Sequence, residues 1–398
     1  MAQKINDFIP FHVPALGQEE EEAVLRVMRS GWITTAKETL AFEQEFSEKM
    51  QSATEKKIYS LAVNSATSGL QLAMECCGVA KENPGKILTT PYTFVSTATA
   101  ACHLGGGVVY ADICEDGYNI DPKQIEYKLA VEKDIRAIVP VHIAGLPCNM
   151  DEICAIGEKY NVPIIEDAAH AFPSKTAKGY AGTLGDIGVF SFYATKTMTT
   201  AEGGMVCTAN PKFAERMSIM RMHGIDRPVW NRYTSEKASW EYDVVAPGYK
   251  FNLPDILSAI GRVQLAKEDY LYAQRCHLAS VYNKAFRDCD FLQLPPDGEG
   301  NAWHLYMLRI VPEKLNINRN QFVSAIQQAG IGISMHFIPH FNLTYLKQKF
   351  NLNPADYPQT LNRYQTSFSI PIWPGLSEDS QQRIIDTIIT LGKNHYVC

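Results

Sequence analysis

A regular alternation of short apolar runs with helical patterns constrains the fold most. The apolar runs, which we interpret as strands, are 58–63, 86–90, 108–113, 135–141, 162–165, 187–192 and 205–208. Helical patterns lie between them near 67–77, 94–104, 121–131 and 149–160. Parallel strands need a long crossover connection, usually a helix, so this alternation predicts an α/β fold with a mostly parallel central sheet flanked by helices.

Beyond the last of these strands the rhythm changes. A long helical stretch, 255–286, is followed by a mixed segment that contains 304–311 and 320–329. With 398 residues, the chain is long enough for two domains. We therefore predict a large α/β domain with an N-terminal arm over 1–265 and a smaller α+β domain over 266–398.

Charge and hydropathy exclude several classes of partner. Lys plus Arg total 37 and Asp plus Glu 43, and the resulting net charge of −6 gives no global attraction to nucleic acid or anionic lipid. No run approaches the roughly 18 apolar residues of a membrane helix, and residues 1–22 lack the apolar region of a signal peptide. The ten cysteines form no C-x-x-C pair. We expect a cytoplasmic protein with no nucleic-acid or membrane partner.

One histidine pair resembles a metal site. His336 and His340 have the i, i+4 spacing of two ligands on one helix, but Pro339 lies between them and disfavours a regular helix. We predict no metal site, and His336 is either a substrate-side residue or a structural one.

Hydroxyl groups follow the first predicted strand. Residues 64–70, NSATSGL, come directly after 58–63 and open a helix. Backbone N–H groups at a helix start, together with the hydroxyls of Ser65 and Thr67, bind a phosphate well. Ordinary helix capping by Ser65 or Thr67 explains the same residues.

Two carboxylates and an imidazole follow the strand 162–165. They belong to Glu166, Asp167 and His170. A carboxylate at the end of a strand can hold a ring nitrogen in its protonated form, whereas helix capping is the plainer interpretation of an isolated Glu-Asp pair.

Lys196 follows the strand 187–192. A desolvated lysine has a lowered pKa and becomes nucleophilic, although most lysines lie on the surface. Ligands of an open parallel sheet bind at the carboxyl ends of its strands, where the phosphate site, the acid and the lysine would meet. These are the three parts that a pyridoxal phosphate (PLP) enzyme needs, so together they predict PLP as the cofactor.

Longer blocks of the sequence carry a specific resemblance. They are SATSGL, PYTFVST, PVHIAGLPCNMDEI, IIEDAAHA, GDIGVFSFYATKTMTTAEGGMV, RMHGI, PGYKFNLPDILSAI and IPIWPGL, in order between Pro10 and Ile384. In these blocks the chain resembles the DegT/DnrJ/EryC1/StrS aminotransferases. Those proteins are fold-type I PLP-dependent transferases that aminate keto groups of nucleotide-linked sugars, and the resemblance implies the same fold, cofactor and substrate class here.

The resemblance also implies a role for each matching residue. Lys196 would form the Schiff base and move the proton between the cofactor and the sugar carbon, and Asp167 would pair with the pyridine nitrogen. His170 would contact the ring hydroxyl, and Phe94 would stack on the ring and be buried. The implied phosphate ligands are Ala66, Thr67 and Ser191.

A block that follows a long loop, 226–247, is implied to reach the neighbouring subunit. Asn252 and, less directly, Lys250 would enter the partner's site, which implies a homodimer with two shared sites. The variant sequence Lys250-Phe251-Asn252 is similar to that of enzymes acting on UDP-linked 4-keto sugars. The predicted substrate-binding residues are Thr34, Tyr193, Lys250 and His336, and Tyr193 stands where the family commonly has His.

We therefore expect an aminotransferase that moves an amino group from L-glutamate to a keto group, at C4, of a nucleotide-linked sugar, leaving 2-oxoglutarate. The product would serve a surface glycan or a natural product. Two alternatives stay open: a non-catalytic binding or regulatory protein that kept the PLP fold, and a PLP-dependent sugar dehydratase. The dehydratase branch of the family replaces the lysine with His, so Lys196 favours transamination.

Overall fold

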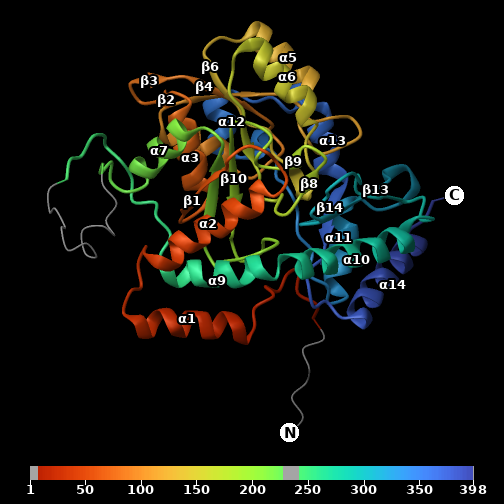
Figure 1. The fold of residues 1–398 in the computed structure, drawn as a ribbon. Coiled ribbons are helices and arrows are strands. Elements are labelled where there is room, and N and C mark those ends of the chain that lie inside the picture. The colour runs from red at the N-terminus through yellow and green to blue at the C-terminus, as the bar shows by residue number, and fades with distance from the viewer. Residues whose placement is uncertain (1–7, 227–241, 398) are drawn as a thin grey trace.

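A seven-stranded mixed sheet forms the centre of the computed structural model, which describes residues 8–226 and 242–397 (Figure 1). The strand order is β1-β11-β10-β7-β6-β4-β5, in which isolated parallel bridges between Ile138 and Ile164 and between Val141 and Asp167 join β6 to β7. The strands are β1 Tyr59–Val63, β4 Lys86–Thr89, β5 Gly107–Tyr110, β6 Ile135–Ile138, β7 Ile165–Asp167, β10 Ile187–Ser191 and β11 Gly204–Thr208.

The prediction of a mostly parallel sheet is confirmed, with one exception. β11 runs antiparallel to both of its neighbours, β1 and β10. An antiparallel neighbour needs only a short return loop, whereas a parallel one needs a crossover. The connection between β10 and β11, residues 192–203, is such a loop, and it carries Lys196.

Helices cover both faces of the sheet. Val189 and Val206 pack in one hydrophobic cluster with helices α3 and α7, whereas Phe190 and Met205 pack in another with α2 on the opposite face. This division follows from the alternation of side chains along a strand. The flanking helices are α2 Lys37–Gln51, α3 Ala66–Cys76, α4 Ser96–His103, α5 Pro122–Val131, α6 Met150–Tyr160, α7 Pro211–Met220 and α9 Asp255–Ala266.

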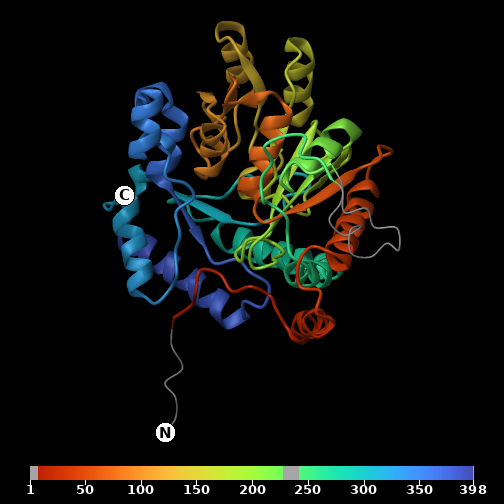
Figure 2. The ribbon, with the colours of Figure 1, turned by 90° about the vertical axis from the view of Figure 1, so that its left-hand side faces the viewer.

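Helix α1, Gln18–Ser30, lies outside this layer and packs only one side on α9 (Figures 1 and 2). Ala23 and Val27 face Ala259 of α9, while Leu25 and Met28 on the other side of α1 are 45% and 57% exposed. Exposed apolar side chains such as Leu25 and Met28 are typical of a surface that contacts another molecule.

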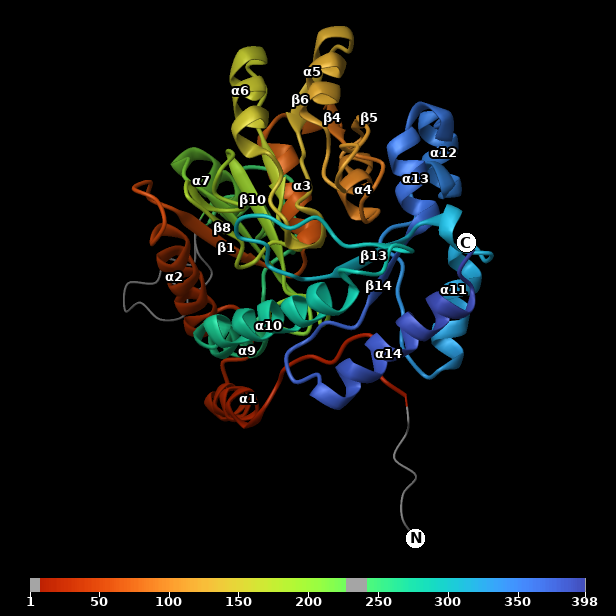
Figure 3. The same cartoon turned by 90° about the vertical axis from the view of Figure 1, so that its right-hand side faces the viewer.

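The C-terminal part of the chain has its own hydrophobic cluster (Figure 3). Its elements are α10 Glu268–Phe286, β12 Leu292–Gln293, β13 Tyr306–Ile310, α11 Arg319–Gln328, α12 Thr344–Phe350, α13 Pro358–Thr366, β14 Ser367–Ile370 and α14 Glu378–Asn394. The single helical stretch expected over 255–286 is two helices that meet at Lys267. The domain boundary at residue 265 lies beside this junction and stays a prediction.

The N-terminal arm crosses from this C-terminal part to the lysine loop. Ile9 donates its N–H to the Gly330 carbonyl at 2.8 Å, and its own carbonyl accepts from the Gly332 N–H at 2.7 Å. Three residues later, Nε2 of His12 donates to the Ala194 carbonyl at 3.1 Å. The arm therefore joins two regions that lie far apart in the sequence.

Four further strands are two-residue hairpin pieces: β2 Val79–Ala80, β3 Asn83–Pro84, β8 Lys175–Thr176 and β9 Gly179–Tyr180. Within the described ranges, none of the helices combines the length and apolar character that crossing a membrane requires. In those same ranges, His, Cys, Asp and Glu side chains form no group of three or more that could hold a metal ion.

Candidate active site

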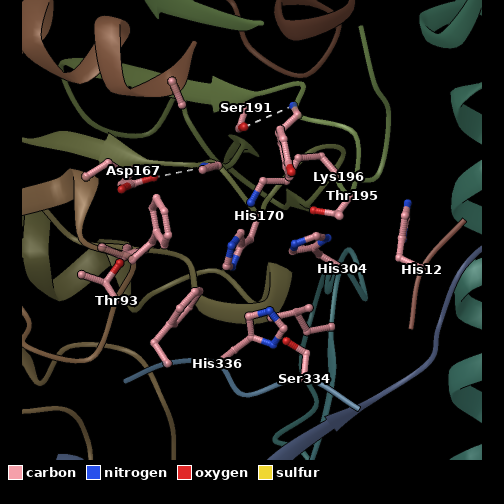
Figure 4. Close-up of a pocket in the computed structure, with 18 of the residues that line it drawn as sticks. His12, Thr93, Asp167, His170, Ser191, Thr195, Lys196, His304, Ser334 and His336 are labelled. Atoms are coloured by element: carbon pink, nitrogen blue, oxygen red, sulfur yellow. Dashed lines mark hydrogen bonds between the residues drawn. The ribbon is translucent and has the colours of Figure 1, made fainter. Parts of the chain in front are cut away.

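A cavity of about 520 Å³ opens at the carboxyl ends of β7 and β10 (Figure 4). This is the edge where an open α/β sheet binds its ligands, and the volume suits a cofactor-sized molecule. Its lining comes from the two strand ends, the start of α3, the N-terminal arm and the C-terminal part of the chain. The predicted site residues that line it are Ala66, Thr67, Phe94, Asp167, His170, Ser191, Tyr193, Lys196 and His336.

Lys196 projects into this cavity from the loop after β10, where its N–H bonds to the Tyr193 carbonyl at 2.9 Å. Desolvation of its ammonium group lowers the pKa from 10.5 to about 8, and the negative charge of Asp167 opposes this shift. A lysine with a pKa near 8 has a much larger neutral fraction near neutral pH than an ordinary lysine, and the neutral amine is a competent nucleophile.

We expect the Lys196 amine of the cofactor-free protein to become reactive as the pH rises through about 8. Protonated lysine does not attack, so the rate follows the neutral fraction. The measurement is the pH dependence of labelling by an amine-reactive reagent, read by mass spectrometry of the Lys196 peptide, with a short free lysine peptide as the reference. The Asp167→Asn variant should titrate at lower pH than the wild type because it lacks the opposing charge. A labelling midpoint near 10 in the wild type would contradict the lowered pKa.

Asp167 and Glu166 point to opposite faces of β7, as successive strand residues must. The Asp167 carboxylate lines the cavity, where Oδ2 accepts from the Thr97 hydroxyl at 2.8 Å and Oδ1 from the Ala169 N–H at 3.2 Å. Burial raises the pKa of Asp167, while these two hydrogen bonds act in the opposite direction. The acid is thus fixed in place with room for one more partner on the cavity side.

Glu166 has a purely structural environment. Its fully buried carboxylate accepts the N–H groups of Gly182, Leu184 and Gly185 at 2.6–2.7 Å. Oε2 also accepts from Nε2 of His142 at 2.9 Å, and Nδ1 of that imidazole accepts the Cys148 N–H, which marks it as the neutral tautomer. Neither acid of the pair caps a helix, so that alternative is wrong for both.

The start of α3 presents donors to the cavity. Ser65 is the N-cap, and its hydroxyl accepts from the Ser68 N–H at 3.1 Å. The first amides of a helix have no carbonyl partner within it, so those of Ala66 and Thr67, both lining the cavity, are placed to bind an anion. Ser65 therefore caps the helix, and the amides of Ala66 and Thr67 are the groups that could bind an anion.

His170 and Phe94 form part of the cavity wall. Nδ1 of His170 accepts the Ala144 N–H at 3.3 Å, and burial places the pKa of the imidazole well below 6.5. The ring is therefore neutral and carries its hydrogen on Nε2, as a donor. Phe94 is 58% exposed rather than buried as we expected, because one face of its ring borders the open cavity.

Three predicted residues lie outside the cavity of their own chain. Lys250 donates to Oδ1 of Asn252, and Nδ2 of Asn252 donates to the Thr35 hydroxyl. Neither residue lines the cavity, and nor does Thr34. Most of the loop that precedes Lys250, residues 227–241, lies outside the described residues.

The two histidines that resemble a metal pair in the sequence, His336 and His340, lie in separate environments. His336 lines the cavity and its Nδ1 lies 2.8 Å from the Ser369 hydroxyl, whereas His340 is fully buried between the Tyr110 hydroxyl and the Thr93 carbonyl. Burial lowers the pKa of His340 to about 4. His340 is thus a structural histidine, and the two imidazoles have separate environments.

Sequence reasoning missed several cavity residues, among them His12, Glu202 and His304. His12 and His304 lie far from the motif blocks around Asp167 and Lys196, and only the tertiary fold brings them there. Burial lowers the pKa of His12 to about 4. Glu202 lies in the same 192–203 loop as Lys196 and could have been found as the one acidic residue of the TTAEGG run.

The residues present fit PLP. The neutral amine of Lys196 could react with the PLP aldehyde, and the Asp167 carboxylate could pair with the pyridinium nitrogen. The amides at the start of α3 could bind the phosphate, and the exposed Phe94 ring could stack on the flat face of the cofactor. Each group matches a different part of one molecule. This fold and site are those of a fold-type I PLP-dependent enzyme.

Comparison with known proteins narrows the class. The model of the DegT/DnrJ/EryC1/StrS aminotransferase family matches residues 14–389, and the chain belongs to that family.

The Bacillus subtilis spore coat polysaccharide biosynthesis protein SpsC is 36% identical over 99% of both chains. Among solved structures, the Streptococcus pneumoniae protein Spr1654 in its PMP form is 27% identical with a TM-score of 0.87, covering 97% of this chain and 99% of its own. The Helicobacter pylori aminotransferase PseC, involved in pseudoaminic acid biosynthesis, is 28% identical with a TM-score of 0.87, covering 97% and 100%. The protein is a PLP-dependent sugar aminotransferase.

Proposed function

We propose that this aminotransferase takes an amino group from L-glutamate and delivers it to the C4 keto group of a UDP-linked sugar. The observation that carries the proposal is the lowered pKa of Lys196 in a cavity that also holds Asp167 and the anion-binding start of α3. PLP, when bound, stabilises negative charge on the reacting carbon and carries the amino group between the two substrates. The remaining chemistry falls to the protein's own residues.

The proposed roles follow from position. Lys196 is the base that moves a proton at the reacting carbon, because its neutral amine is the nucleophilic group of the cavity. Asp167 keeps the ring nitrogen protonated, and His170 orients the ring by donating from Nε2. Ala66, Thr67 and Ser191 hold the phosphate, and Phe94 covers the ring face and excludes water. Tyr193 and His336 contact the sugar.

Two features support a nucleotide-sugar substrate used for a surface glycan. The relatives SpsC and PseC are named for spore coat polysaccharide and pseudoaminic acid biosynthesis. The Lys250-Phe251-Asn252 sequence supports the UDP-linked 4-keto class. Because the nucleotide lies far from the reacting carbon, its binding energy can position the ketone over the amine.

The proposal is tested with the purified PLP-loaded enzyme, L-glutamate and a UDP-linked 4-keto sugar. We expect 2-oxoglutarate and an amino sugar in equal amounts, with ¹⁵N from labelled glutamate in the sugar by mass spectrometry. Parallel reactions with dTDP-linked and 3-keto sugars examine the nucleotide and the ring position. Preferred conversion of either would overturn that part of the proposal, and no transfer to any keto sugar would overturn the sugar substrate.

We also propose a homodimer with shared active sites. Leu25, Met28 and Ile33 on and after α1 are exposed apolar side chains, and Phe94 and Tyr193 are exposed at the cavity itself. Charge depletion with apolar and aromatic enrichment is typical of the core of a subunit interface. Asn252 and Lys250, which lie outside their own cavity, would reach the partner's phosphate or substrate from this surface.

Mixing two inactive variants tests the shared sites. Lys196→Ala and Asn252→Ala dimers should each be impaired, and exchange of subunits between them should restore about a quarter of the wild-type sites. The reason is that half of a random mixture consists of hybrids, each with one intact site. The measurement is turnover after mild denaturation and joint refolding, with each variant refolded alone as the control. If mixing restores nothing although mass spectrometry detects hybrids, Asn252 acts within its own subunit.

A further inference from the structure

His304 is a buried histidine at the cavity that the roles above leave unused. It is 5% exposed and lies beside His170, with 4.4 Å between the ring centroids, below Lys196 in Figure 4. Nδ1 of His304 has no hydrogen-bond partner among the described residues. A buried N–H without a partner is rarer than a buried acceptor without one, so we assign the hydrogen to Nε2.

A buried arginine fixes the backbone around His304 by hydrogen bonds. Arg275, 1% exposed, donates from Nη1 to the carbonyls of Trp303, His304 and Ile372 at 2.9–3.3 Å. Trp303 has a positive φ of 49°, a conformation that a bulky residue adopts only when its surroundings impose it. Such strain next to an unpartnered imidazole indicates a position fixed for function rather than for packing.

The same loop also bonds to the short helical turn Ile143–Gly145 that follows β6. The N–H groups of Ala302 and Leu305 donate to the carbonyls of Gly145 and Ala144 at 2.9 and 3.3 Å. The N–H of Ala144 is the group that orients His170. His170 and His304 are therefore positioned by one continuous network, and both rings border the cavity.

The surroundings of His304 contain two cationic side chains, Lys196 and Arg275, and two further imidazoles, those of His170 and His336. Burial and the neighbouring His170, Lys196, Arg275 and His336 hold its pKa well below 6.5, so the imidazole is neutral before any ligand enters. The acidic residues of the cavity lining are Asp167, already held by Thr97 and Ala169, and Glu202. This side of the cavity is thus favourable for an anion and offers it a neutral N–H donor.

We propose that His304 binds the carboxylate next to the amine of the amino donor and so makes the enzyme selective for α-amino acids. This inference rests on the proposed function only in that the donor is an amino acid. It adds a specificity-determining residue to the site.

The position of the α-carboxylate relative to the reacting amine distinguishes it from the diphosphate of the sugar substrate. The α-carboxylate is attached to the carbon that carries the reacting amine, so it must lie close to Lys196 in the productive complex. The diphosphate of a nucleotide sugar is attached on the opposite side of the sugar ring from C4, several bonds from the reacting ketone. His304 borders the cavity near Lys196, whose charge acts on it. It is therefore placed to contact the α-carboxylate of the donor and not the diphosphate of the nucleotide sugar.

The test compares L-glutamate with 4-aminobutyrate, which has the amine and the distal carboxylate but lacks the α-carboxylate. Each donor reacts with the PLP-loaded enzyme in the absence of sugar, and the cofactor absorbance gives kcat/KM for that half-reaction. His304→Gln places an amide N–H near the position of Nε2, whereas the matched variant His304→Asn places it near Nδ1. Cofactor absorbance and melting temperature check that both variants are folded and loaded.

We expect His304→Asn to lower the preference for glutamate over 4-aminobutyrate by roughly ten- to hundredfold, the usual effect of losing a hydrogen bond to a charged group. His304→Gln should keep most of the preference. Calorimetric titration with 2-oxoglutarate, which carries no amine to transfer to PLP, should show weaker binding to His304→Asn by a similar factor. Lys212→Ala, a change at an exposed residue of α7 that does not line the cavity, should leave the donor preference unaltered.

Two outcomes overturn the inference: an unchanged preference in His304→Asn, or equal losses in the Gln and Asn variants, which would indicate a packing role. The half-reaction contains no sugar, so it reports on His304 whatever sugar the enzyme accepts. Conversely, a wild-type enzyme that fails to aminate any keto sugar overturns the proposed function and leaves the donor result standing.

Discussion

Replacing Lys196 with alanine should lower turnover by at least about 10⁴-fold, because in the proposed mechanism this amine is both the covalent attachment point of the cofactor and the base of the proton transfer. The pKa of about 8 already distinguishes this amine from an ordinary lysine. Turnover is measured with donor and keto sugar at saturation. Borohydride reduction followed by mass spectrometry should fix the cofactor to the Lys196 peptide of the wild type and to no peptide of the variant.

Lys212→Ala serves as the control, since Lys212 is an exposed residue of α7 remote from the cavity lining. It should keep wild-type turnover and the covalent label. A Lys196→Ala variant that retains a tenth of the wild-type rate would refute the assignment of the catalytic lysine, and would revive the possibility that this chain uses the fold only to bind.

The second large effect is expected for Asp167→Asn. The amide has the shape of the carboxylate and can keep contacts with Thr97 and the Ala169 N–H, so the fold should persist. It cannot pair ionically with a protonated ring nitrogen. Breaking a buried ion pair costs about 3–5 kcal/mol, which corresponds to a loss of about 10²–10⁴-fold in rate. The measurement is kcat of the donor half-reaction, with the pH dependence of the cofactor spectrum as an independent readout.

The adjacent acid offers a matched comparison. Glu166→Gln disturbs the carboxylate that holds the 182–185 turn, so we expect a loss of about 1–3 kcal/mol in the free energy of unfolding, with turnover per cofactor-loaded site within about tenfold of the wild type. The two substitutions should therefore separate cleanly into a kinetic and a thermal defect. Equal catalytic losses in both would contradict the division of roles along β7.

Local patterns predicted the parts of this site that follow strand ends. Asp167 lies at the end of β7 and Lys196 follows β10 within five residues, and position near a strand end is a property that a single sequence displays. The direction of β11 was not predictable in this way, because an apolar run has the same periodicity whichever way it points. The helix break at Lys267 was missed because the residues on both sides of it are good helix formers.

The rest of the site depends on long-range contacts. His304 shares no motif with Lys196 and reaches the cavity only because Arg275 and the 144–145 turn hold its loop there. Phe94 was expected to be buried since an aromatic in a motif normally packs, and its exposure became visible only with the shape of the cavity. Such features depend on how separate segments dock, which no local window of sequence records.

The N-terminal arm has a consequence for the order in which the protein can be built. Residues 9–12 bridge Gly330 and Gly332 to Ala194, so some of the first described residues line the cavity and are held there by residues more than 300 positions later. Ribosomes deliver chains from the N-terminus, and domains commonly fold as they emerge. The sheet with Asp167 and Lys196 can therefore form before the arm binds the segment 330–332. The growing chain should bind the cofactor tightly only after synthesis has passed residue 332. The docking of the arm therefore sets the earliest point at which the active site can be complete.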